Sequence, residues 1–85
     1  MESMDEIRRS AARGAQLARA PGGKVIELPD RPLLKVRAVY GRAVAQTPTH
    51  VLHEWVKVGE FHIRWDEKWQ VRKVPAGEWH GEPLD

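Results

Sequence analysis

Residues 51–74 read VLHEWVKVGEFHIRWDEKWQVRKV, and apolar and polar residues alternate through most of this stretch. A period of two residues is typical of a β-strand with one buried face. Gly59-Glu60 interrupts the alternation, and Gly at the first central position favours a type II′ hairpin turn. The stretch therefore predicts a β-hairpin with three facing pairs on its inner side: Val58 with Phe61, Val56 with Ile63, and Glu54 with Trp65.

The opposite face of this hairpin is predicted to carry aromatic and basic side chains together. Its members are His53, Trp55, Lys57, His62 and Arg64. Trp55 faces Arg64 in this register, so the guanidinium can stack on the indole ring. A slip of one residue would invert every side chain and would put Trp55 into the core instead.

A third strand is predicted to follow a three-residue loop at residues 66–68. That loop places Trp65 opposite Trp69 and Ile63 opposite Val71, and it adds Gln70 and Arg72 to the aromatic-basic face. The predicted core of the β-structure is Phe61, Ile63, Trp65, Trp69 and Val71. After it, residues 81–85 are predicted to be a loose polar tail, with Trp79 packed back on the sheet.

An N-terminal helix is predicted for residues 3–20. Ser3 and Glu6 have the spacing of a capping box, and Pro21 with two following glycines ends the helix. The helix carries a narrow apolar stripe: Met4, Ile7, Ala11, Ala15 and Ala18. This stripe can dock on the β-structure or on a partner. We therefore divide the chain into a helical arm (residues 1–22), a small β domain (23–80) and the tail (81–85).

These elements predict a mostly β, α+β fold. Residues 24–28 and 33–40 add strand candidates, while residues 42–46 suit either a strand or a short helix. About five short strands without a crossover helix indicate a small, bent antiparallel sheet with an N-terminal helix. Alternatively, they close into a barrel whose layout resembles the SH3-like and Tudor-like barrels.

The composition excludes several classes of protein. The 85 residues contain no Cys, so neither a disulfide framework nor a thiolate metal site is expected. No apolar leader and no apolar run of 18 residues occurs, which predicts a cytoplasmic protein that does not bind membranes. Residues 1–45 hold nine Lys and Arg against five Asp and Glu, and this basic excess hints at nucleic acid or an acidic partner.

The sequence does not suggest catalysis, a metal or a cofactor. Its only serines, Ser3 and Ser10, lie in the predicted helix, and the glycine pair at residues 22–23 precedes a strand rather than a helix. The four histidines do not converge in the predicted register: His50, His53, His62 and His80. We therefore expect a protein that is not an enzyme.

The sequence instead predicts a binding module, regulatory or accessory, with nucleic acid as the favoured partner. Aromatic rings accept stacked bases, and Lys and Arg neutralise phosphates. The predicted contact residues are Trp55, Lys57, His62, Arg64 and Arg72 on the sheet, and Arg8, Arg9, Arg13 and Arg19 on the helix. A net charge of only +2 favours an alternative, a protein-interaction module that docks on a larger assembly through the apolar stripe. A homo-oligomeric structural subunit is a third possibility, and the oligomeric state stays open.

Overall fold

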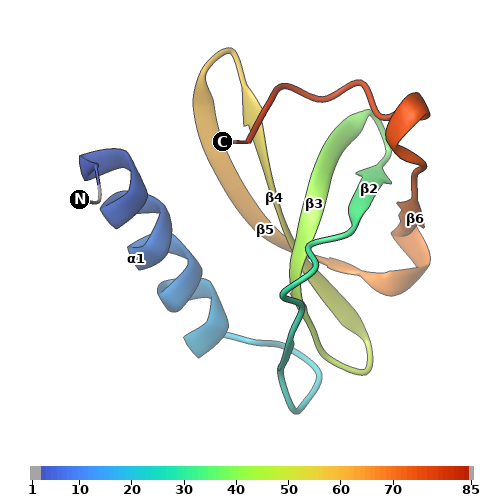
Figure 1. The fold of residues 1–85 in the computed structure, drawn as a ribbon. Coiled ribbons are helices and arrows are strands. Elements are labelled where there is room, and N and C mark those ends of the chain that lie inside the picture. Colours follow the sequence, from blue (N-terminus) through green and yellow to red (C-terminus); the bar gives the residue numbers. More distant parts are fainter. Residues whose placement is uncertain (1–2, 85) are drawn as a thin grey trace.

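One helix and six strands follow one another along residues 3–84, which are the residues that this computed structural model describes (Figure 1). All strand pairs are antiparallel. The main elements are α1 (Met4–Ala18), β1 (Ile26–Glu27), β2 (Leu33–Val36), β3 (Val39–Gln46), β4 (His50–Lys57), β5 (Glu60–Glu67) and β6 (Val71–Lys73). Two short 3₁₀ helices, η1 (Lys68–Gln70) and η2 (Ala76–Glu78), precede and follow β6.

The strands form one open sheet in the order β5-β4-β3-β2-β6, with β1 added to β3. Within residues 3–84 the outer strands β5 and β6 do not pair with each other, so the sheet does not close. The α+β fold with an N-terminal helix and a small antiparallel sheet is therefore confirmed. Of the two arrangements that the sequence allows, the open sheet is the one observed. Residues 42–46, which also suited a helix, belong to β3.

Helix α1 begins where the capping box predicts, because Ser3 Oγ accepts a hydrogen bond of 3.2 Å from the Glu6 amide. The helix ends at Ala18, two residues earlier than predicted. The side chains turned toward the sheet are spaced as one helical face: Arg9, Ala12, Arg13, Gln16 and Leu17. The Trp65 indole anchors this face, since its Nε1 donates to the Gln16 carbonyl at 2.9 Å. The apolar stripe from Met4 to Ala18 is consequently exposed.

The β4–β5 turn corrects the predicted hairpin register. Val58 and Gly59 are the two central residues, with φ of 52° and 76°, and Lys57 pairs with Glu60. Two positive φ values are typical of a type I′ turn, whose twist suits a two-residue hairpin. Glu82 supports the turn by accepting hydrogen bonds from the Val58 and Gly59 amides at 2.5 and 3.3 Å. Val58 is therefore 85% exposed and does not face Phe61 as predicted.

In the observed register, each residue of β4 pairs with a residue of β5 two positions earlier than predicted. Phe61 lies opposite Val56, while Ile63 lies opposite Glu54. Because side chains alternate with a period of two, this shift leaves each paired residue of β4 and β5 on its predicted face. Trp55 now pairs with His62 rather than with Arg64.

The third strand exists as β6, but the prediction that it pairs with β5 is wrong. After β5, helix η1 redirects the chain, and β6 pairs with β2 at the other edge of the sheet. This pairing packs Val71 against the buried side chains of Leu34 and Val36, which pairing with β5 would not provide. Trp69 accordingly does not face Trp65 in the core; it lies on η1 and is 77% exposed.

Two apolar clusters form the core. The first contains Leu34, Val36, Ala43 and Val51, with Leu28 and Val71 packed against them. The second contains Val44, Ala45 and Leu52, with Leu17 of α1, Val25, Ile63 and Trp65 packed against them. A β-bulge between Ala43 and Ala45 lets β3 contribute to both clusters.

The C-terminal segment also packs on the sheet. Trp79 Nε1 donates to the Gly41 carbonyl at 2.9 Å, as the predicted return of Trp79 requires. Leu84, expected in a loose tail, is buried. Residues 1, 2 and 85, which belong to the predicted arm and tail, lie outside the described residues.

Candidate nucleic-acid interface

The aromatic-basic hairpin face forms a continuous stack. The half-buried Trp55 ring lies between two imidazoles, with centroid distances of 5.0 Å to His53 and 5.2 Å to His62. The Arg64 guanidinium lies over the Trp55 ring at 5.0 Å, so the predicted contact between them exists. It is a diagonal contact, because Arg64 pairs with His53 in the sheet. Lys57 is exposed at the end of this face, next to the turn.

Asp66 fixes the inner end of this stack. It lies 2.5 Å from His53 Nε2 and accepts a hydrogen bond of 2.8 Å from Arg64 Nε. Burial lowers the pKa of His53, and the contact with Asp66 opposes that shift only in part. Burial would raise the pKa of Asp66, but its hydrogen bonds with His53 and Arg64 lower it. On this face, Arg64 thus already has a carboxylate partner.

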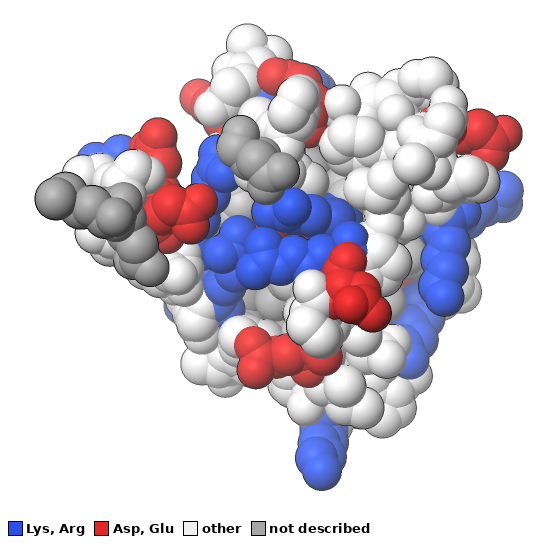
Figure 2. Space-filling model, viewed as in Figure 1, with Lys and Arg blue, Asp and Glu red and all other residues white. Residues whose placement is uncertain are grey.

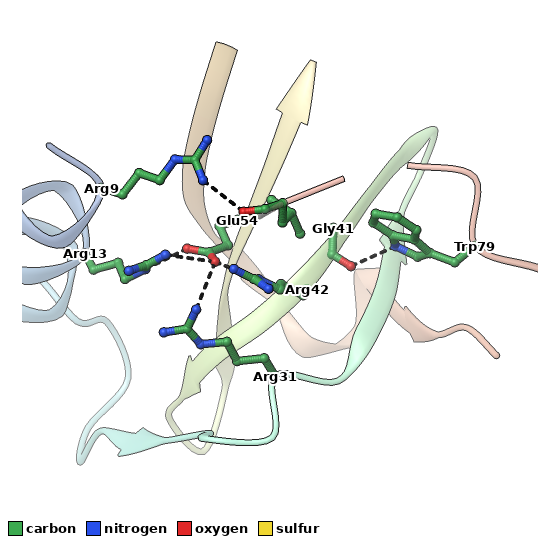
Figure 3. A network of polar contacts seen from close by, with 8 residues as sticks. Arg9, Arg13, Arg31, Gly41, Arg42, Glu54 and Trp79 are labelled. Atoms are coloured by element: carbon green, nitrogen blue, oxygen red, sulfur yellow. Dashed lines mark hydrogen bonds and ion pairs between the residues drawn. The ribbon is translucent and has the colours of Figure 1, made fainter. Parts of the chain in front are cut away.

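The buried Glu54 collects arginines from three parts of the chain (Figure 3). Arg13 Nε and Nη2 of α1 bind its two oxygens at 2.7 and 3.1 Å, and Arg42 Nε of β3 binds at 2.8 Å. Arg31 Nη1 lies 3.6 Å away. Burial would raise the pKa of Glu54, but the hydrogen bonds from Arg13 and Arg42 lower it, so the carboxylate stays ionised.

Two of the four helix arginines predicted to bind phosphate are instead bound within the protein. Arg13 is bound to Glu54, and Arg9 donates to the Leu84 carbonyl at 2.9 Å. Their guanidiniums also lie 5.8 and 5.2 Å from the centre of the Phe61 ring. Figure 2 shows the resulting band of Lys and Arg atoms between α1 and the sheet. Arg8 and Arg19 point to solvent.

A second aromatic-basic site, which the sequence does not predict, lies at the β2–β6 edge of the sheet. A hollow of about 450 Å³ opens there, and we call it the basic hollow. Its lining residues are Lys35, Arg37, Trp69, Gln70 and Arg72. None of these five side chains is acidic. Figure 2 shows Lys and Arg atoms along this β6 side of the molecule.

Strand pairing brings the cations of the basic hollow together. Lys35 of β2 and Arg72 of β6 are direct partners in the antiparallel pair. Arg37 sits in the two-residue turn that joins β2 to β3, with a φ of 56°. Arg72 therefore belongs to this site and not to the Trp55 face, from which β3 and β2 separate it.

Trp69 is the aromatic wall of the basic hollow. Its Nε1 donates a hydrogen bond to Glu67, which holds the edge of the indole. The ring also borders a second hollow of about 430 Å³, lined on its other sides by Thr49, His50, Glu67 and Lys68. An indole that borders two hollows and is largely exposed has a free surface for stacking.

Comparison with known protein families, curated proteins and solved structures finds no match for this chain. Within residues 3–84, no group of three or more His, Cys, Asp or Glu side chains is arranged to hold a metal ion. Over the same residues, no helix has the length and apolar character needed to cross a membrane.

Proposed function

We propose that this protein is a non-enzymatic nucleic-acid-binding module, regulatory or accessory, whose binding surface is the basic hollow. The observation that carries the proposal is the lining itself: three cationic side chains and one exposed indole, without a carboxylate among them. Cations bind phosphates, and an exposed indole stacks on a base.

The pairing of Lys35 with Arg72 supports an anionic ligand. Like charges that lie directly opposite each other on neighbouring strands destabilise a sheet. The five side chains that line the hollow include no acid to offset this repulsion. A bound phosphate would offset this repulsion, so the pair favours an anionic ligand.

The proposal has a quantitative consequence for salt dependence. Each phosphate contact lowers the logarithm of the affinity by about 0.7 to 0.9 per unit of log salt concentration. Three cations in one site therefore imply a slope of about −2 to −3. A slope near zero would contradict the proposal.

The test is fluorescence anisotropy with labelled DNA and RNA over a salt series. The triple variant Lys35→Ala/Arg37→Ala/Arg72→Ala is expected to bind at least tenfold more weakly and with a flatter salt slope. The matched control Arg8→Ala/Arg19→Ala/Lys57→Ala removes the same charge from exposed positions of the helix and hairpin. We expect less than a threefold loss in the control. If the control loses as much as the hollow variant, binding is diffuse and the basic hollow is not the site.

A second candidate function is protein docking through α1. The observation that favours it is the exposure of the apolar stripe, with Met4 64% and Ile7 48% exposed. An apolar helix face that the sheet does not cover suits a groove on a protein partner. In that case Ala11→Glu with Ala15→Glu would abolish capture of a partner from lysate, while the basic-hollow variant would still capture it.

A further inference from the structure

We infer that the ligand of the basic hollow is a single strand, which inserts one unpaired base against Trp69 and lays its flanking phosphates on Lys35, Arg37 and Arg72. This inference rests on the proposed function and adds the class of nucleic acid to it. Four features of the site carry it: the exposed indole, the size of the hollow, the grouping of the cations and the prior orientation of the side chains.

The exposed indole of Trp69 points to an unpaired base. Inside a duplex, the faces of each base are covered by the neighbouring base pairs, and extruding a base costs a few kcal/mol. A base in a single strand has a free face and stacks on an aromatic ring at no such cost. With 77% of its surface exposed, Trp69 offers its ring without rearrangement of the protein.

The size of the hollow also fits one nucleotide. Its volume of about 450 Å³ lies within the usual range for small-ligand sites, which is about 300–1,000 Å³. A duplex is far wider than such a hollow, so it would reach only the outer rim. A single nucleotide can enter and touch the indole and the cations together.

The cations lie together on one side of the sheet. Lys35 and Arg72 are Cα partners on adjacent strands, so their side chains leave the same face about 4.7–4.9 Å apart. Arg37 follows Lys35 by two residues, at the turn. Gln70 is the lining side chain whose neutral amide offers both a donor and an acceptor to a base edge.

Residues outside the lining hold two of these side chains in place before any ligand binds. Glu67 accepts the Trp69 Nε1 hydrogen bond, and the Tyr40 ring lies 5.0 Å from the Lys35 ammonium. Tyr40 is in turn held edge-on to His80, with ring centroids 5.6 Å apart. Because these side chains are already oriented, less conformational entropy is lost on binding.

The experiment compares an unstructured oligothymidine and an oligouridine with a hairpin duplex of equal phosphate number, by anisotropy at low salt. We expect the single strands to bind at least tenfold more tightly than the duplex. Trp69→Ala should weaken single-strand binding by about fivefold to 150-fold, the usual effect of losing one stacked base. Trp69→Phe, which keeps an aromatic ring, should retain most of the affinity, and circular dichroism checks that both variants fold.

The outcomes separate this inference from the proposed function. Tighter single-strand binding that depends on an aromatic side chain at position 69 supports both. Equal binding of strand and duplex that needs the three cations but not Trp69 overturns the inference and leaves the proposed function intact. Failure of wild type to bind any of the probes at low salt overturns both.

Discussion

Arg13 of α1 and Glu54 of β4 form a two-pronged ion pair across 41 positions of sequence, with N–O distances of 2.7 and 3.1 Å. Arg42 of β3 binds the same carboxylate at 2.8 Å. Glu54 therefore joins the helix to two neighbouring strands, in a place where its side chain has no contact with water. The helix is held by this charge network together with Leu17 and the Trp65 hydrogen bond, and not by its apolar stripe.

Glu54→Gln should destabilise the protein by about 3 kcal/mol. The substitution keeps the shape of the side chain but leaves the partly buried Arg13 without its counter-charge and removes one partner of Arg42, and breaking a buried pair typically costs 3–5 kcal/mol. Urea denaturation measures the loss in free energy of unfolding. The control is Glu60→Gln, an exposed carboxylate on β5, for which we expect a change below about 0.5 kcal/mol. Equal effects of the two substitutions would mean that the network contributes nothing to stability.

The stability should decline as pH falls below about 6.5. Burial lowers the pKa of His53 from its ordinary value of 6.5, so the folded protein favours the neutral imidazole. Below pH 6.5 the unfolded chain binds the proton more readily, and the stability from His53 is lost as pH falls through the folded pKa. Glu54 and Asp66, whose pKa values are lowered from 4.5 and 3.8, add a second decline below those values.

His53→Gln separates the two parts of this pH dependence. The Gln amide can still donate to Asp66 but does not titrate, so the decline just below pH 6.5 should disappear while the decline below pH 4.5 remains. Urea denaturation at a series of pH values measures both. The His53 Nδ1 atom is buried and has no hydrogen-bond partner among the described residues. Protonating it would bury an unpaired N–H, which strengthens the expected effect. An unchanged decline in the variant would assign the upper titration to another group.

Val58→Asn should stabilise the protein by about 1 kcal/mol. Val58 has a φ of 52° in the β4–β5 turn, a conformation that costs a β-branched residue about 1–3 kcal/mol. Asn tolerates this region, and Asn-Gly is the preferred type I′ pair. Thermal and urea unfolding measure the gain. Val58→Thr is the matched control, because it stays β-branched and should give no gain.

Gly41→Ala and Gly14→Ala should change the stability in opposite directions. A Cβ at Gly41 would lie 2.4 Å from the Glu54 carbonyl oxygen, so β3 and β4 would have to move apart. A Cβ at Gly14 would meet nothing within 4 Å, and Ala in a helix is favoured over Gly by about 0.5–1 kcal/mol. Unfolding of both variants should show destabilisation in the first and stabilisation in the second. A stabilised Gly41→Ala protein would contradict the close approach of Gly41 on β3 to the Glu54 carbonyl on β4.

Local patterns were sufficient to predict that residues 51–67 form a hairpin and where the helix begins, but not the hairpin's turn or the helix face that docks. The apolar stripe suggested one face, whereas the sheet binds the face with Arg9 and Arg13. The buried Glu54 explains why the arginine face docks instead of the apolar stripe, since a carboxylate in the protein interior needs cationic partners. The sequence did contain one signal for a cationic docking face, which was Glu54 on the inner face of the predicted hairpin. Acids are almost never fully buried unless they are paired.

The basic hollow could not be predicted because it depends on pairing between distant segments. Lys35 and Arg37 alternate with Val36 and suit any exposed strand face, and nothing in the sequence connects them to residues 69–72. The pairing of β6 with β2 follows from the packing of Val71 in the first apolar cluster. That pairing places Arg72 in the basic hollow and not on the predicted aromatic-basic face. It also places Trp69 in the basic hollow and not in the predicted core.

Replacing Trp55 and Trp69 in turn should separate stability from binding. Trp55 is half-buried between His53 and His62, so Trp55→Ala should cost about 2 kcal/mol in unfolding free energy and leave the affinity of the folded protein for a single strand unchanged. Trp69 is exposed, so Trp69→Ala should change the stability by less than about 0.5 kcal/mol and weaken binding. Urea denaturation and anisotropy on the same preparations measure both quantities. The reverse result, a folded Trp55→Ala protein that no longer binds, would make the hairpin face predicted from the sequence the interface and would leave Trp69 without a role in binding.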